Sequence, residues 1–191
     1  MDLITVFIYT LFIVGIGELG DKTQIATGTN ALANKENVRI IFFSSTLALI
    51  LVAGITVFFA GLIPKEYLEV IKNAGGLLLI FYGLYLLLKG EDGGDSNEVN
   101  YQRINKLKLF ITNFSIVLIA ELGDKTQVTT LAIAIENQTQ LFIVFLASVT
   151  ALTLVTLVTT WGITKIPSQK VIVVQKIGAT LMIIYGVYML F

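Results

Sequence analysis

The sequence predicts an all-α integral membrane protein in which six transmembrane helices form two inverted three-helix repeats. Three observations support this fold class. First, 55% of the 191 residues are hydrophobic and 14% are charged, whereas soluble domains carry about 25% charged residues. Second, the apolar residues form blocks of about 20 residues rather than one helical stripe, as lipid requires. Third, the two halves of the chain match at a constant offset of 103 residues.

Six apolar blocks define the expected spans, at about 3–33, 38–63, 67–88, 107–135, 141–163 and 171–191. The second span ends at Pro64 and the fifth near Pro167. The chain is expected to divide into a first three-helix repeat (1–88), a polar linker (89–106) and a second repeat (107–191), which together form one transmembrane domain. The Met1-Asp2 start carries no basic residues, so the first block is interpreted as a retained span rather than a signal peptide.

The match between the halves extends well beyond one motif. The offset relates Asn34 to Asn137, Ser45 to Ser148, Gly75 to Gly178, Pro64 to Pro167 and Tyr82-Gly83 to Tyr185-Gly186. Such self-similarity indicates a duplication. A unit with three spans begins and ends on opposite sides of the membrane, so the second copy must be inverted. Inverted repeats with a site at their interface are typical of transporters.

The loop charges predict the orientation of the spans. One side of the membrane would carry Lys35, Arg39, Lys89, Arg103, Lys106, Lys108, Lys165, Lys170 and Lys176, and the other side only Lys65 and Lys72. Basic loops stay in the cytoplasm. The linker is therefore expected to be cytoplasmic and both termini to lie outside. The formal net charge of zero gives no reason to expect a nucleic-acid partner.

One heptapeptide, Glu-Leu-Gly-Asp-Lys-Thr-Gln, occurs at residues 18–24 and again, unchanged, at 121–127. Each copy lies inside an apolar block, where acidic side chains are costly and usually mark an ion or substrate pathway. On a helix, Glu18 and Asp21 would share one face, as would Glu121 and Asp124. Inversion would bring these faces together, so we expect four carboxylates to surround one cavity.

The available ligand atoms indicate the kind of ion. The neutral oxygen donors expected near the carboxylates are Thr23, Gln24, Thr126 and Gln127. The chain has no His and no Cys, and oxygen-only sites favour Ca²⁺, Mn²⁺ or Mg²⁺. Mutual repulsion among four carboxylates favours proton uptake, so protons should compete with the metal. No prosthetic group is expected.

Other roles for the motif remain open. Glu18 and Lys22 are four residues apart and could form a buried pair that only locks two helices together. Lys22 and Lys125 could also offset the acidic charge when no metal is bound. Ser45 and Ser148 lie mid-span at equivalent positions, where hydroxyls commonly form interhelical hydrogen bonds but could also support the site.

At these residues the chain resembles the transmembrane-protein-165-like (Gdt) family, because E-x-G-D-[KR]-[ST] occurs twice in a six-span protein. The resemblance implies transport of Mn²⁺ or Ca²⁺ with proton exchange, and it implies that Glu18, Asp21, Glu121 and Asp124 are the cation ligands. The short linker resembles that of compact prokaryotic members, so the plasma membrane is the expected location.

We therefore predict a secondary transporter of divalent cations, with protons as the counter-ion, rather than an enzyme. The alternatives are a metal-dependent intramembrane enzyme, for example acting on lipid phosphates, and a divalent-cation channel or sensor. An enzyme of that kind would need Arg or His beside the acids to bind phosphate, and the motif offers only two lysines.

Overall fold

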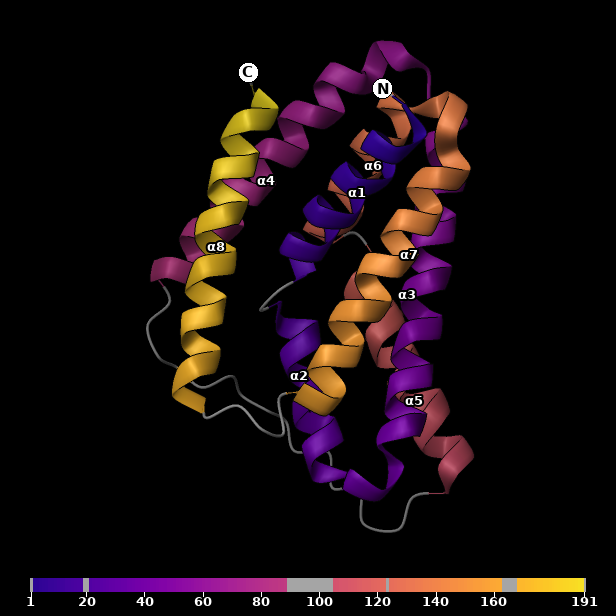
Figure 1. Cartoon of the computed structure of the whole chain (residues 1–191), viewed down its shortest axis with the longest axis vertical. Helices are drawn as coiled ribbons and strands as arrows, with labels where there is room; N and C mark the ends of the chain where they lie inside the picture. The colour runs from indigo at the N-terminus through magenta and orange to yellow at the C-terminus, as the bar shows by residue number, and fades with distance from the viewer. Residues whose placement is uncertain (1, 19–20, 89–104, 123, 163–167, 191) are drawn as a thin grey trace.

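The computed structural model describes residues 2–18, 21–88, 105–122, 124–162 and 168–190, and within these ranges the regular structure is entirely helical (Figure 1). The helices are α1 (Leu3–Glu18), α2 (Lys22–Ala33), η1 (Lys35–Asn37), α3 (Val38–Ala60), η2 (Lys65–Tyr67), α4 (Leu68–Leu88), α5 (Lys106–Glu121), α6 (Lys125–Glu136), η3 (Gln138–Gln140), α7 (Leu141–Leu157), the π-helical turn η4 (Val158–Gly162) and α8 (Ser168–Leu190). The all-α class is thus confirmed. The predicted linker, 89–106, falls almost entirely outside the described residues.

The distribution of side chains is that of a protein in lipid. Three described helical segments are long and apolar enough to cross a membrane, Lys35–Ala60, Lys65–Tyr85 and Gln138–Gly162, and Leu3–Glu18 and Ala179–Tyr188 are shorter apolar helices. Large apolar side chains lie on the outside, including Phe12, Phe43 and Phe58. Carboxylates lie inside, since Glu18 and Glu121 are 0% exposed. Water would favour the opposite arrangement, so we conclude that this is an integral membrane protein.

The expectation that the two acids of each motif share one helical face is wrong. In the block at 3–33, α1 ends at Glu18 and α2 begins at Lys22, and in the block at 107–135, α5 ends at Glu121 and α6 begins at Lys125. Asp21 and Asp124 therefore do not lie on a helical face with Glu18 and Glu121. Both Asp residues have extended backbones, with φ −65° and ψ 153° at Asp21 and φ −68° and ψ 159° at Asp124.

The motif itself explains these breaks. In each copy the Asp backbone N–H donates to the Glu carbonyl at 3.2 Å, which ties the Asp to the end of the first helix. The Asp side chain then accepts from the backbone N–H of the Thr two residues later and caps the next helix. Asp is among the preferred residues at this position. The spacing Glu-x-x-Asp thus places a helix end and the cap of the next helix three residues apart.

Three elements of the first half have counterparts with the same bounds in the second half. The offset of 103 residues takes the bounds of α1 onto those of α5, α2 onto α6, and η1 onto η3. In Figure 1, α1 lies above α2 whereas α6 lies above α5, so the two broken pairs run in opposite directions. α1 begins and α8 ends at the same end of the bundle.

Close packing between α4 and α8 also follows the offset. A Cβ on Gly186 would lie 2.6 Å from the Gly76 carbonyl, and one on Gly83 would lie 2.7 Å from the Ala179 carbonyl. At the offset of 103 residues, Gly76 corresponds to Ala179 and Gly83 corresponds to Gly186. The two contacts are therefore equivalent, with the repeats exchanged. Small residues allow membrane helices to approach closely. The remaining helices pack α1 on α7 and α3 on α5, around buried clusters that include Val6, Val14 and Leu152.

Candidate metal centre

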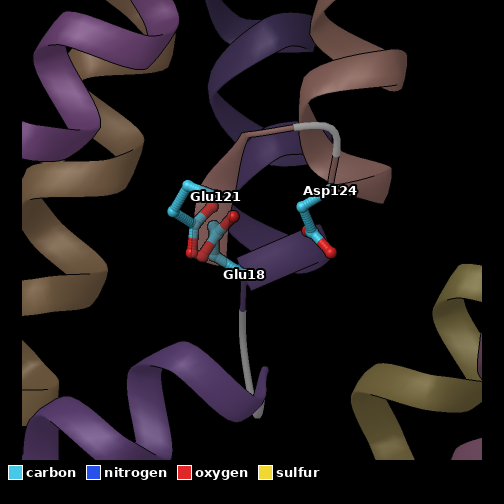
Figure 2. Close-up of side chains that lie close together, drawn as sticks. All are labelled: Glu18, Glu121 and Asp124. Atoms are coloured by element: carbon cyan, nitrogen blue, oxygen red, sulfur yellow. The ribbon is translucent and has the colours of Figure 1, made fainter. Parts of the chain in front are cut away.

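Three carboxylates from the two motifs meet where the helices are broken. Glu18 ends α1, Glu121 ends α5, and Asp124 precedes α6. One carboxylate oxygen from each lies within 4.8 Å of the others. Figure 2 shows Glu18 and Glu121 side by side, with the Asp124 carboxylate at a short distance from the pair. A cation placed among these three oxygens could bind ligands from both halves of the chain.

Three oxygen atoms of this cluster have no hydrogen-bond partner in the part of the chain that the structure describes. Among the described residues, neither carboxylate oxygen of Glu121 has a hydrogen-bond partner, and the same is true of Glu18 Oε1. The other Glu18 oxygen accepts only a long bond of 3.4 Å from Gln24 Nε2. An unpaired carboxylate in a dry interior is strongly disfavoured. A bound cation or a proton would remove that cost.

Asp21, the fourth motif acid, has a different partner. It is 2% exposed, and its Oδ1 pairs with Lys125 Nζ, while its Oδ2 accepts the Thr23 N–H at 3.0 Å. Lys125 Nζ also donates to Asp124 Oδ2 at 3.1 Å. Lys125 therefore links the acid of one repeat to the acid of the other. The predicted set of four carboxylates is divided into a cluster of three and Asp21, and Lys125 contacts both Asp21 and the Asp124 member of the cluster.

The helix ends contribute to the electrostatics of the cluster. α2 and α6 begin at the site, and the N-terminus of a helix carries a partial positive charge that favours nearby carboxylates. Because each motif Asp caps its own helix, this contribution acts on Asp21 and Asp124 directly. α1 and α5 end there with Glu18 and Glu121, and the C-terminus of a helix attracts cations.

The neutral oxygen donors predicted from the motif lie near the cluster but differ in their contacts. Gln24 Nε2 reaches Glu18, and also Thr156 Oγ1 at 3.5 Å. Gln127 Oε1 instead accepts from Thr56 Oγ1 at 2.8 Å. The two Gln residues are equivalent in sequence, yet only Gln24 reaches a motif carboxylate among the described contacts.

The threonines of the motif act mainly through their backbones. The Thr23 N–H donates to Asp21, and the Thr126 N–H donates to Asp124 Oδ2 at 3.3 Å. The Thr126 hydroxyl is buried without a partner among the described residues and lies 3.3 Å from the position of a Cβ on Gly17. It is therefore available as a further neutral ligand.

The remaining predicted residues are placed as follows. Ser45 accepts from Asn113 Nδ2 at 2.9 Å, which is an interhelical bond between α3 and α5. Ser148 is fully buried, and its hydroxyl has no partner among the described residues. The side chain of Lys22 lies outside the described residues, so the alternative of a Glu18–Lys22 pair stays open.

Sequence reasoning missed a polar cluster around Asn113. The Asn113 amide donates to Ser44 Oγ at 2.8 Å and to Ser45, and its oxygen accepts from Asn30 Nδ2 at 2.9 Å. This cluster joins α2, α3 and α5. The sequence analysis named only Ser45 of this cluster, and the interhelical hydrogen bond expected of it is formed with Asn113. The further signal was an Asn inside an apolar block, whose repeat equivalent is Thr10.

A cavity of about 290 Å³ lies next to the site, between α1, α6 and α8. Gly17 and Thr126 form its wall toward the motif, and Leu181 and Tyr185 line it from α8. The lining is almost entirely apolar, so this space is not itself an ion-binding site. It does give α8 room to move relative to the site.

Comparison with known proteins gives one match. A family profile described as "Divalent cation/proton antiporter GDT1" matches residues 6–94 and 109–191, which is most of the chain and includes both motifs. The comparisons with curated proteins and with solved structures give no match.

Proposed function

Because the chain belongs to the divalent cation/proton antiporter GDT1 family, we propose that it exchanges Mn²⁺ or Ca²⁺ for protons at the paired acidic motifs. Membership makes it a cation transporter of a family defined by antiport rather than by enzymatic activity. The choice of ion and the assignment of ligands are our inference from the site.

The observation that carries the proposal is the cluster of Glu18, Glu121 and Asp124, whose oxygens lie within 4.8 Å of one another. The unpartnered oxygens of the two Glu residues require either a cation or protons when they face no water. A site that binds either the cation or protons, but not both at once, couples the movement of the cation to the opposite movement of protons. Carboxylate ligands without His or Cys favour hard dications such as Ca²⁺ and Mn²⁺.

We further propose six membrane crossings in two inverted repeats. α1 and α2 together contain 28 residues, about 42 Å of helix if stacked end to end, which is enough to cross a bilayer. The same holds for α5 and α6. Broken helices whose ends meet near mid-membrane are the common way in which transporters build ion sites. The loop charges support a cytoplasmic linker and external termini, in a prokaryotic plasma membrane.

Uneven packing of the two halves supports alternating access. α4 packs on α6, and α8 packs on α1, where the hydroxyls of Tyr9 and Tyr185 are 2.8 Å apart. The equivalent pairs would be α8 with α2 and α4 with α5, and no comparable packing is found there among the described residues. The α4–α8 pair thus lies against the part of the bundle that is formed by α1 and α6, beside α1 in Figure 1. In the opposite state it would lie against α2 and α5.

Transport assays on sealed vesicles test this function. The purified chain in proteoliposomes containing a pH dye should take up Mn²⁺ or Ca²⁺ and export protons in exchange. The internal pH should therefore rise as the cation enters. Glu121→Gln keeps the shape of the side chain but removes its charge, so flux should fall to the level of protein-free vesicles. Glu69→Gln makes the same change on an exposed surface and should transport normally.

Other outcomes would assign the alternatives. Ion flux that leaves the internal pH unchanged would indicate a channel, and ion binding without flux would indicate a sensor. Metal-dependent turnover of a lipid phosphate in detergent would indicate an enzyme. Transport that survives both Glu18→Gln and Glu121→Gln would refute the assigned site.

A further inference from the structure

Lys125 is a buried cation inside the acidic site. Its side chain is 3% exposed, and its ammonium group pairs with Asp21 Oδ1 and donates to Asp124 Oδ2 at 3.1 Å. The two acids belong to different repeats, so Lys125 bridges the two halves at the point where their broken helices meet. A lysine at this depth needs such partners, because an unpaired charge in lipid is costly.

The two partners of Lys125 are not equivalent. Asp124 also belongs to the cluster of three carboxylates with Glu18 and Glu121, whereas Asp21 does not. A cation bound in the cluster would therefore share Asp124 with the lysine and would lie close to a second positive charge. Lysine offers donors only and cannot ligate the ion while it is protonated.

We propose that Lys125 is an internal competitor of the transported dication, which holds Asp21 and part of Asp124 and thereby keeps ion affinity low enough for release. This inference rests on the proposed function. It divides the motif acids by role: Glu18, Glu121 and Asp124 bind the ion, and Asp21 binds the lysine. Two like charges in a poorly screened interior repel strongly, so the lysine weakens ion binding directly.

Replacing the lysine by an apolar residue of similar length tests the inference. With Lys125→Met, the lysine no longer holds Asp21 and Asp124, and its repulsion of the bound ion is lost. The dissociation constant for Mn²⁺, measured by calorimetry on the full chain in detergent, should fall by about tenfold or more. Release should slow, so the rate of Mn²⁺ transport in vesicles should fall although binding is tighter. Lys108→Met, at an exposed lysine of α5, is the matched control.

The direction of the change separates this role from a structural one. If Lys125 only held the repeats together, its loss would loosen the site and weaken Mn²⁺ binding. Unchanged or weaker binding in a folded Lys125→Met variant would therefore overturn the proposal while leaving the proposed function intact. A wild-type chain that binds no Mn²⁺ or Ca²⁺ would overturn both.

A second comparison covers the case in which Lys125→Met does not fold because Asp21 loses its lysine partner. Asp21→Asn and the double variant Asp21→Asn/Lys125→Met differ only by the lysine, and neither leaves Asp21 charged. The double variant should bind Mn²⁺ more tightly than Asp21→Asn alone. Equal affinities would contradict competition between the lysine and the ion.

Discussion

At the scale of single residues, the motif is informative because its four acids and Lys125 have different tasks. Glu18 and Glu121 present oxygens without hydrogen-bond partners among the described residues, Asp21 and Asp124 cap helices, and Lys125 bridges the two repeats. The sequence predicted which acids would matter from their depth in apolar blocks. It could not predict that they differ, because the two copies are identical and only their surroundings distinguish them.

The capping role of the motif Asp can be tested apart from ion binding. Asp124→Ala removes both the cap of α6 and a cluster oxygen, whereas Asp124→Asn keeps a side-chain oxygen that can still accept from the Thr126 N–H. We expect Asp124→Ala to lower the free energy of unfolding by about 1 kcal/mol more than Asp124→Asn does. Thermal melts of the two variants without added metal would measure the difference. Equal stability would show that the cap contributes nothing.

The Asn113 cluster provides another prediction at this scale. Asn113→Ala removes donors to Ser44 and Ser45 and an acceptor for Asn30. Interhelical bonds of this kind in membranes contribute about 0.6 kcal/mol on average, so the loss of three should cost about 1–2 kcal/mol. Denaturation in mixed micelles would measure this loss of stability, with Asn73→Ala, at an exposed position, as the control. No loss of stability relative to that control would mean that Ser44, Ser45 and Asn30 find other hydrogen-bond partners in the variant.

At the scale of helices, hydropathy located the apolar blocks but not the breaks within two of them. A window that averages over about 20 residues cannot resolve a turn of three residues. The local signals were present in the sequence. Gly20 and Gly123 each lie two residues after a motif Glu, and Asp is a preferred N-cap residue. The expected shared helical face of Glu18 and Asp21 was wrong for this reason. The three carboxylates meet because α1 and α5 end at the site, and Asp124 begins α6 there.

The contact between α4 and α8 yields a matched pair of glycine substitutions. A Cβ on Gly186 would clash with the Gly76 carbonyl at 2.6 Å, whereas one on Gly54 would lie 3.6 Å from Phe145, an ordinary contact. Gly186→Ala should therefore destabilise the protein by about 1–3 kcal/mol. Gly54→Ala should be neutral or slightly stabilising, since Ala is the better helix former. Comparable stability of the two variants would refute the close approach.

Movement of the α4–α8 pair can be followed with paired cysteines, because the chain has none of its own. Tyr9→Cys/Tyr185→Cys, joined by a short thiol-specific linker, should hold the present state and stop transport. The repeat-equivalent pair Thr112→Cys/Tyr82→Cys should react mainly in the opposite state. Single-cysteine variants treated with the same reagent are the controls. Full transport with the first pair cross-linked would contradict alternating access through this contact.

At the scale of the whole molecule, the bounds of α1, α2 and η1 recur in α5, α6 and η3 at an offset of 103 residues. The all-α class was predictable from sequence, since apolar blocks and self-similarity depend on many residues at once. What the sequence could not give is the asymmetry of the packed state. α4–α8 lies against α1 and α6, Gln24 and Gln127 have different partners, and Asp21 is engaged by Lys125.

The central claim, that both motifs bind one dication, can be tested most directly by locating the ion. Crystals grown with Mn²⁺ and measured at the manganese absorption edge should give one anomalous peak among the carboxylates of Glu18, Glu121 and Asp124, and Glu121→Gln should remove it. An ordered Mn²⁺ bound elsewhere in the bundle, with these three side chains turned away from one another, would contradict the account.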